Sequence, residues 1–415
     1  MGEQRIIVAH PGRQHSFRLA SALKKSHMLL YYVTTIYDND SLLMNSIKKF
    51  LSSDNLKRAN NRKNNDLEKH DVIQYCELWG MIEAFLSRYP KFKKVYYIIQ
   101  RKNADRFGLK VAKLAIKHKA DAVIMYDSNA LKCFEYLSKN APYIKRIMDV
   151  SSAGRPFRKE LYQKEVEKSG YDDLKRENSY MWEAKPMERM KKELLLTEYF
   201  FVPSSFVGKS LLFSGVSEDQ LLLVPYGANV SSDFTHRRKN SEPVHFLFAG
   251  NINYNKGILY LLKAMKDVIG ANLTLTGAYD PNAEFLKNYL DMPNVNFTGR
   301  VTFDKMKDIY EHADVFVIDS FSEGMAQVGI EAMACGLPII CSTNSGVNDL
   351  VEDYKNGFII QPGEAEALRE KMQWFVDNSQ QISFMGENAK KTACCYTWEQ
   401  YEKNVVGAIN NVLKR

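Results

Sequence analysis

Two glutamates lie eight residues apart in the segment FSEGMAQVGIEAMACGLPIICS, at Glu323 and Glu331. A glycine-containing turn separates them and leads into a helical pattern. If both were helical, they would sit about 12 Å apart along the axis and about 80° around it. Carboxylates that act together on one glycosidic bond lie about 5–9.5 Å apart. We therefore expect the two glutamates to contact different parts of one extended ligand.

Both glutamates also have a structural interpretation, Glu323 as a charge at a helix N-terminus and Glu331 as a solvated residue. Glu331, however, belongs to the apolar stretch IEAMACG. An unpaired carboxylate is costly in such a helix, and this cost favours a functional role.

The segment FLFAGNINYNKG (246–257) predicts a strand, a turn at Gly250 and a helix opened by Lys256. Free backbone N–H groups at a helix N-terminus, with a lysine beside them, suit a diphosphate. The turn before the second helix offers N–H groups of the same kind, at Gly324, Met325 and Ala326. The alternative is that Gly250 only makes the turn and Lys256 is an ordinary surface residue.

Short apolar runs alternate with amphipathic stretches, and these elements must position the residues above. In the first half we expect strands at 5–10, 94–100 (KVYYIIQ), 121–127, 143–150 and 199–205. In the second half we expect them at 244–250, 271–277, 295–299, 314–320, 337–342 and 357–362. Helical patterns separate the strands, so the predicted fold class is α/β, with two doubly wound, Rossmann-like parallel-sheet domains facing a central cleft.

The polar, basic stretch SSDFTHRRKNSEP (231–243) predicts a linker between these domains. We expect an N-terminal domain at 1–230, a C-terminal domain at 244–395 and a terminal helix at 396–415 that crosses back to the first domain. Residues 38–95 are rich in Lys and Asn and predict an inserted helical region, and residues 155–198 predict charged helices.

The net charge of +8 is unevenly distributed along the 415 residues. Residues 1–240 hold 42 Lys and Arg against 27 Asp and Glu, whereas residues 241–415 hold 15 against 22. A basic first half can attract an anionic membrane face or an anionic acceptor, although a solvated surface explains it equally well. Nucleic-acid binding is not expected, because the basic stretch lacks aromatic residues at the spacing of a known module.

The chain has no apolar run long enough for a transmembrane helix, and its start lacks the pattern of a signal peptide. Its six cysteines show no Cys-x-x-Cys spacing. We expect reduced cysteines in a cytoplasmic protein, with peripheral contact at the inner face of the membrane through the basic half.

Residues 321–342 resemble the Glu-x7-Glu signature of the family 4 retaining glycosyltransferases, which have the GT-B fold. The resemblance extends over about residues 200–415. Within it, FAGNINYNKG is similar to the family's phosphate-binding turn, TGR (298–300) to the strand end beside the base, and the tail with Trp398 to the helix that crosses between domains. Residues 1–199 resemble the family only in strand order and in the N-terminal glycine loop.

The resemblance implies a role for each matching residue. Glu331 would accept hydrogen bonds from the donor ribose, Glu323 would contact the transferred sugar, and Lys256 would stabilise the leaving diphosphate. The remaining donor-binding positions would be Gly250, Asn251, Arg300 and Val301 beside the nucleotide, Gly324, Met325 and Ala326 on the diphosphate, and Gly12 and Arg13 across the cleft.

Three positions depart from the family's pattern. Asn251 stands where an arginine usually follows the glycine of the phosphate turn, so one cation is lost where charge develops. The first turn reads Pro11-Gly12-Arg13 instead of carrying two glycines, and we expect Arg13 either to supply the missing cation or to be a solvated turn residue. Asp149 stands where many relatives end a strand with His, as a substrate contact or as a cap.

His15 and Asp127 are further candidates on the acceptor side of the cleft, because each is expected to end a strand that faces it. No Asp-x-Asp run is placed as a metal site would need, and Lys256 with the helix ends could do the same electrostatic work. We therefore expect no metal and no cofactor.

The function that the resemblance implies is transfer of a sugar from a nucleotide diphosphate to a hydroxyl acceptor, with retention, in polysaccharide or glycoconjugate assembly. The acceptor would be lipid-linked or anionic. Two alternatives stay open: a sugar-nucleotide epimerase of the same fold, and a non-catalytic partner whose donor site has decayed.

Overall fold

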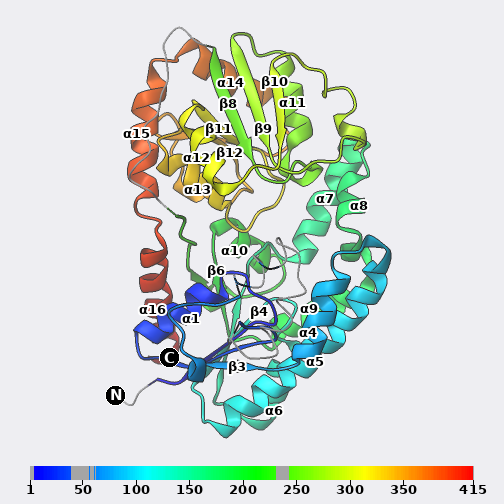
Figure 1. The fold of residues 1–415 in the computed structure, drawn as a ribbon, viewed down its shortest axis with the longest axis vertical. Helices are drawn as coiled ribbons and strands as arrows, with labels where there is room; N and C mark the ends of the chain where they lie inside the picture. Colours follow the sequence, from blue (N-terminus) through cyan, green and yellow to red (C-terminus); the bar gives the residue numbers. More distant parts are fainter. Residues whose placement is uncertain (1–3, 39–55, 57–59, 61, 230–242, 415) are drawn as a thin grey trace.

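A computed structural model describes residues 4–38, 56, 60, 62–229 and 243–414. The chain forms two α/β domains, one above the other in Figure 1. The predicted linker lies outside the described residues except for Pro243. The prediction of two doubly wound parallel sheets is confirmed.

The first sheet has seven strands in the order β3-β2-β1-β4-β5-β6-β7, and every neighbouring pair is parallel. Its strands are β1 (Ile6–Ala9), β2 (Leu29–Thr34), β3 (Val72–Gln74), β4 (Ala122–Tyr126), β5 (Lys145–Asp149), β6 (Tyr199–Val202) and β7 (Leu221–Leu223). The strand order reverses between β1 and β4, and ligands of open α/β sheets bind beyond the carboxyl ends of strands at such a switch point.

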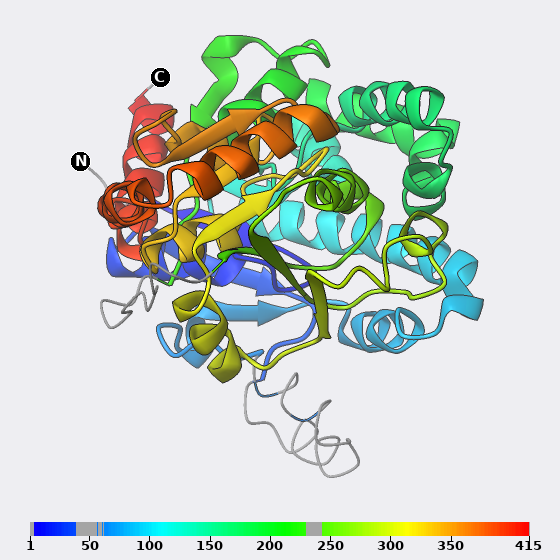
Figure 2. The ribbon, with the colours of Figure 1, turned by 90° about the horizontal axis from the view of Figure 1, so that it is seen from above.

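Helices cover both faces of this sheet (Figure 2). They are α1 (Ser16–Lys25), α4 (Glu77–Leu86), α5 (Lys93–Lys117), α6 (Leu131–Asn140), α7 (Arg155–Ser169), α8 (Asp173–Glu177), α9 (Ala184–Leu195) and α10 (Ser205–Leu212).

The second sheet repeats the same order with six strands, β10-β9-β8-β11-β12-β13. Its strands are β8 (Val244–Ala249), β9 (Ala271–Thr276), β10 (Val295–Gly299), β11 (Val315–Ile318), β12 (Ile339–Ser342) and β13 (Gly357–Ile360). Its helices are α11 (Ile258–Lys266), α12 (Phe303–Glu311), α13 (Gln327–Ala334), α14 (Ala365–Asp377) and α15 (Gln381–Ala393), followed by α16 (Trp398–Lys414). All six predicted strands of this half are present.

The first half differs from the prediction in five places. Strands β2 and β7 were not predicted. The run KVYYIIQ, expected as a strand, is part of helix α5. Of the region 38–95, expected to be helical, residues 39–55, 57–59 and 61 lie outside the described residues, and the described part contains the edge strand β3 as well as α4. His15 does not end a strand, because β1 ends at Ala9 and His15 is the residue directly before α1, where its side chain makes no capping hydrogen bond.

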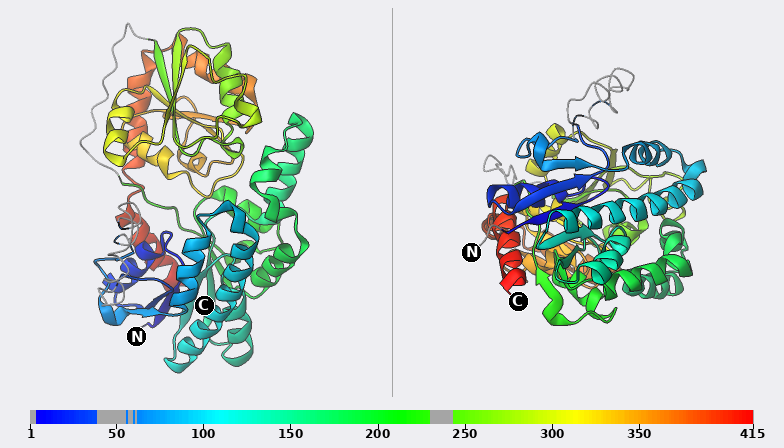
Figure 3. Two further views of the ribbon diagram at one scale, coloured as in Figure 1. Left: turned by 45° about the vertical axis from the view of Figure 1, so that its right-hand side comes forward. Right: turned by 90° about the horizontal axis from the view of Figure 1, so that it is seen from below.

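Two helical connections join the domains on opposite sides (Figures 1 and 3). On one side α16 crosses from the second domain and packs on α1, where Lys25 forms an ion pair with Glu402 at 2.8 Å. On the other side Glu165 of α7 accepts hydrogen bonds from the hydroxyls of Tyr254 (2.8 Å) and Tyr260 (2.6 Å) in the second domain. Segments of the first domain are thus part of the second domain's packing.

Two glycines allow backbone segments to approach where no side chain fits. A Cβ on Gly257 would lie 2.0 Å from the carbonyl oxygen of Asp319, and Gly257 has a φ of +71°. A Cβ on Gly324 would lie 1.9 Å from the carbonyl oxygen of Ser151, which belongs to the other domain. The loop after β11 is therefore held against the turn after β8 within its own domain and against the end of β5 across the cleft.

Replacing Gly257 with alanine should destabilise the fold by about 1–3 kcal/mol or more, because the new Cβ meets backbone and the φ is unfavourable for L residues. Urea unfolding of the purified chain measures this change. The matched control is Gly407→Ala in α16, where an added Cβ meets nothing within 4 Å and should stabilise the helix by about 0.5–1 kcal/mol. Equal effects of the two substitutions would contradict the close approach at Gly257.

Candidate functional site

Lys256 and Glu323 meet at the carboxyl edge of the second sheet, where the ammonium of Lys256 forms an ion pair with the carboxylate of Glu323. Lys256 follows β8, and Glu323 follows β11. Asn255 fixes the two loops together, because its carbonyl accepts the N–H of Phe321 (2.8 Å) and its side-chain amide donates to the carbonyl of Ser322 (3.2 Å). The structure thus brings together two residues that the sequence separates by 67 positions.

Glu331 lies on α13, half-buried, and its carboxylate makes no hydrogen bond or ion pair with any residue in the described ranges. Burial raises the pKa of its carboxyl above the usual range. The buried hydroxyl of Tyr310 has a raised pKa for the same reason, with the charge of Glu331 adding to the effect. A carboxylate left without a partner at this depth is suited to accept hydrogen bonds from a ligand.

The turn between these glutamates is not helical. Glu323 lies outside α13, which begins at Gln327, so the spacing calculated for two helical positions does not apply. The N–H of Ala326 donates to the carbonyl of Ser345 at 3.1 Å. Of the three N–H groups expected to face a phosphate, those of Gly324 and Met325 have no acceptor among the described residues.

The other expected donor residues lie on the neighbouring strand ends of the same sheet edge. Gly250 follows β8 with a φ of +146° and donates its N–H to the carbonyl of Thr276 at 2.9 Å. Asn251 follows it with an exposed side chain. Arg300 and Val301 follow β10, Arg300 exposed and Val301 partly buried.

Gly12 and Arg13 occupy the first turn of the N-terminal domain, after β1. The N–H of Gly12 donates to Nδ1 of His10 at 2.8 Å, and burial lowers the pKa of His10 to about 4. Arg13 is exposed, with its guanidinium 5.4 Å from the ring centroid of Phe17. His10 was not among the expected site residues, although its place at the end of the first strand could have indicated it.

Asp149 ends β5 and is almost fully buried, and its carboxylate lies 2.9 Å from Nε2 of His15. Tyr126, Tyr226 and Tyr401 surround the pair; burial raises the pKa of each hydroxyl, and the charge of Asp149 raises it further. Asp149 is thus placed as a partner of His15 and not as a helix cap. The tyrosines come from three distant segments, and only the fold reveals them.

Asp127 follows β4, one residue beyond the end of the strand. Burial raises the pKa of its carboxyl, and the charges of Arg155 and Arg158 oppose the increase. The hydroxyl of Ser151 donates to Asp127 at 3.4 Å. Ser151 is also the residue whose carbonyl lies against Gly324, so the acceptor-side strand ends and the donor loop adjoin at one point.

Three further contacts hold the domains together at this point. The hydroxyl of Ser204 donates to the carbonyl of Gly324 at 2.6 Å, and the N–H of Tyr226 lies 3.3 Å from the sulfur of Met325. The N–H of Ser205 donates to Asp349 at 2.7 Å. The two halves of the candidate site therefore share a direct interface.

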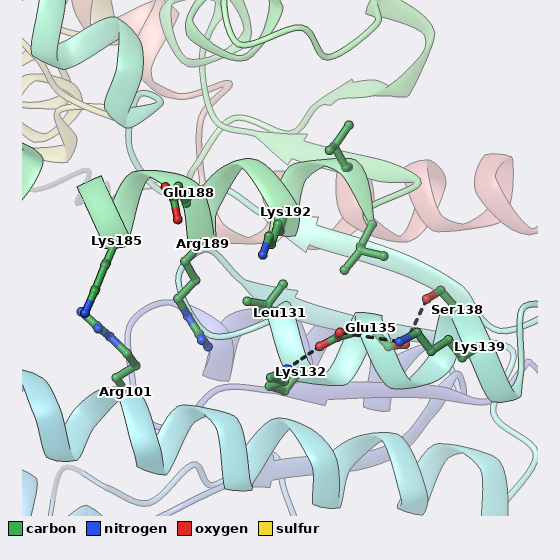
Figure 4. A pocket seen from close by; sticks show the side chains of 12 residues that line it. Arg101, Leu131, Lys132, Glu135, Ser138, Lys139, Lys185, Glu188, Arg189 and Lys192 are labelled. Atoms are coloured by element: carbon green, nitrogen blue, oxygen red, sulfur yellow. Dashed lines mark hydrogen bonds and ion pairs between the residues drawn. The ribbon is translucent and has the colours of Figure 1, made fainter. Parts of the chain in front are cut away.

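The N-terminal domain contains cavities between its helices and beside its first turn. One of about 280 Å³ lies between the first turn and helices α4 and α5, and is lined mostly by polar residues: His10, Gln14, Arg62, Glu83, Ser87 and Gln100. Two cavities of about 550 Å³ lie between α5 and α9, one bordered by α6 and the other by the loop after β4, and Arg101 and Arg189 line both. Figure 4 shows one of these, with Arg101, Lys185, Arg189 and Lys192 directed into it.

Within the described parts of the chain, no group of three or more His, Cys, Asp or Glu side chains is arranged to hold a metal ion. All six cysteines are free. No helix among the described residues combines the length and the apolar character that crossing a membrane requires.

The raised pKa of Glu331 predicts a pH-dependent effect of Glu331→Gln. Above its folded pKa the buried carboxylate is charged and costs stability, whereas glutamine is neutral at every pH. The variant should therefore be more stable than the wild type at pH 7, and the difference should disappear as the pH falls through the pKa of Glu331. Thermal unfolding at a series of pH values measures this; a pH-independent difference would contradict an ionised, buried carboxylate.

In the comparison with known proteins, the family match lies in the second domain. Residues 231–392 match the family model of the group 1 glycosyl transferases. The sulfoquinovosyl transferase of Arabidopsis thaliana is 27% identical over 271 residues, which cover 57% of this chain and 53% of that protein. The chain thus spans about half the length of this curated relative.

Solved structures support the fold across the whole chain. Sucrose-phosphate synthase from Thermosynechococcus elongatus superposes with a TM-score of 0.64 at 19% identity, covering 99% of this chain and all of that one. The Anabaena protein HepE, solved in complex with UDP, gives a TM-score of 0.62 at 13% identity, covering 98% of this chain and all of that one. The chain has the two-domain GT-B fold, and its residues 231–392 match the group 1 glycosyl transferases.

Proposed function

We propose that the protein is a retaining glycosyltransferase that moves a sugar from a nucleotide diphosphate donor to a hydroxyl acceptor. The observation that carries this proposal is the arrangement at the edge of the second sheet. There, Lys256 and Glu323 form an ion pair, and Glu331 is half-buried without a partner among the described residues. One cation and one carboxylate on adjoining loops, with a second carboxylate on the helix that follows, suit a diphosphate, a sugar and a ribose.

Binding of the donor would exchange partners at the ion pair. The ammonium of Lys256 would turn to the diphosphate, and the carboxylate of Glu323, released, would accept hydrogen bonds from the sugar hydroxyls. The N–H groups of Gly324 and Met325 would add donors to the phosphate. Glu331 would accept hydrogen bonds from the ribose hydroxyls. These bonds would offset the free-energy cost of burying its charge.

In the transfer step the acceptor oxygen forms a bond to the anomeric carbon while the bond from that carbon to the phosphate breaks. Both changes occur on one face of the sugar, so the configuration is retained, and the departing phosphate oxygen takes the acceptor's proton. Lys256 would stabilise the charge that develops on the phosphate, where fixed charges in a water-poor site have their greatest effect. The proposed reaction needs no metal and no cofactor.

The acceptor would bind on the N-terminal side of the cleft, beside Asp127 and the pair of His15 and Asp149. A polar cavity lies next to the first turn there, and the surrounding half of the chain is basic. These features favour a lipid-linked or anionic acceptor, in polysaccharide or glycoconjugate assembly at the inner face of the membrane.

The second candidate is a sugar-nucleotide epimerase. One observation favours it: His15 and Asp149 lie 2.9 Å apart at the cleft edge, and such a reaction needs a carboxylate and a histidine beside the sugar. Asp149, however, is almost fully buried, so its carboxylate does not reach a substrate. In this alternative His15 would have to contact the sugar in its place.

Product analysis with donor alone and with donor plus candidate acceptors tests the proposal. We expect a glycosylated acceptor and free nucleoside diphosphate, and Lys256→Ala should lower turnover by about 100-fold or more. Lys266→Ala, on the exposed side of α11, is the matched control and should leave turnover unchanged. An isomerised sugar nucleotide formed without acceptor would replace the transferase proposal with the epimerase.

Arg13 is proposed to supply the cation that Asn251 lacks. Arg13→Ala should then lower turnover by about tenfold or more, since a hydrogen bond to a charged group contributes about 1.5–3 kcal/mol. Adding Asn251→Arg to this variant should restore much of the loss, because the phosphate regains a cation from its own domain. Unchanged turnover in Arg13→Ala, measured at saturating and at low donor concentration, would rule out this role.

A further inference from the structure

Helix α4 is apolar, and two of its large apolar side chains are exposed. Seven of its ten residues are Leu, Trp, Met, Ile, Ala or Phe, yet Gly80 is its only buried residue. Leu78 is 68% exposed and Phe85 is 54% exposed. Contiguous exposed apolar side chains on a protein surface mark sites of interaction.

The apolar surface continues through the turn into α5. The rings of Phe85, Tyr89 and Phe92 lie in sequence, with centroids 5.0 and 6.2 Å apart. Val95 and Ile98 follow on the first turns of α5, where they are 47% and 57% exposed. Their spacing of three places them on one side of the helix.

Cations outnumber anions along this surface, and the carboxylates that flank it in the sequence are Glu77, Glu83 and Asp105. From Ala84 to Ala104 the chain contains six Lys or Arg residues and no Asp or Glu. All six are exposed: Arg88, Lys91, Lys93, Lys94, Arg101 and Lys102. We call the residues 84–104 the hairpin surface. Exposed aromatic and aliphatic side chains among cations are typical of segments that lie in the interface of an anionic bilayer.

The hairpin surface also adjoins the candidate acceptor side. Because α5 runs away from the cleft towards β4, the turn between α4 and α5 lies at the cleft end of the hairpin (Figures 1 and 3). Glu83, Ser87 and Gln100 line the polar cavity beside the first turn. Ile98 and Lys94 line the neighbouring cavity, which Arg155 and Arg189 also line. Both cavities therefore open beside the same apolar and basic surface.

We propose that the hairpin surface docks the protein on an anionic lipid bilayer, with Phe85, Tyr89, Val95 and Ile98 in the interface and the cations on lipid head groups. Burial of apolar side chains and the attraction of each cation to anionic head groups would act together. This docking would bring the polar cavity to the membrane surface. The consequence for the acceptor, that it is a lipid-linked molecule with its head group in that cavity, rests on the proposed function, whereas the docking itself does not.

The test is flotation of the full chain with vesicles of phosphatidylcholine alone or mixed with phosphatidylglycerol. We expect binding to the mixed vesicles, weakened by salt because screening reduces attraction between the charges. The double variant Phe85→Ser with Ile98→Ser should bind at least about tenfold more weakly. Phe384→Ser on α15, where the side chain is 59% exposed, is the matched control and should bind like the wild type.

Lys91→Gln with Lys93→Gln separates the charge contribution from the apolar one, and should weaken binding to the mixed vesicles about tenfold or more. Absence of vesicle binding, or an equal loss in Phe384→Ser, would overturn the proposal. Self-association of the chain through the hairpin surface, detected by light scattering without vesicle binding, would also overturn it in favour of a protein interface. Nucleotide binding by the same variants, measured separately, shows whether the donor site is intact, so failure of docking and failure of the proposed function are distinguishable.

Discussion

The contact between Gly324 and Ser151 is the constraint on which the candidate site depends. There is no room for a Cβ at Gly324, because the carbonyl of Ser151 lies in its place. The same short loop carries Glu323 on one side of the contact and Met325 on the other. Ser151 follows Asp149 by two residues. A single backbone approach therefore fixes the loop that holds the ion pair against the strand end that holds His15 and Asp149.

The contact between Gly324 and Ser151 is one of several contacts between the two domains. Met325 belongs to a buried apolar cluster that includes residues of both sheets, such as Ile124 and Phe316. Helix α16 and the α7–α8 segment hold the domains on opposite sides. Any closing motion of the cleft must preserve or rearrange these contacts.

The sequence predicted the second domain well because its signals agree with one another. Each strand is a short apolar run that ends at a turn residue, Lys256 and Glu323 lie where two loops meet, and Glu331 lies on the helix that follows. The first domain was harder. KVYYIIQ has the aromatic and β-branched residues of a strand, but it continues into a long helix that packs on α4 and α6. Local propensity is a weak guide where tertiary packing decides.

What no pattern could predict was the pairing of distant side chains. The ion pair between Lys256 and Glu323 and the contact between His15 and Asp149 both depend on strand order. The hydrogen bond from the N–H of Ala326 to the carbonyl of Ser345 depends on the position of the loop after β12. Asn251, by contrast, was visible in the sequence as the place where a cation is missing, and the exposed side chain found there leaves that interpretation unchanged.

The central claim is that the edge of the second sheet binds a nucleoside diphosphate sugar. Thermal unfolding in the presence of UDP, GDP and ADP sugars tests it most directly. The account predicts that one of these donors, at about 100 times its dissociation constant, stabilises the wild type by about 2.7 kcal/mol, and that the stabilisation is lost when Lys256 and Glu331 are both replaced by alanine. Unfolding that is unchanged by every donor, or a stabilisation that survives in the double variant, would contradict it.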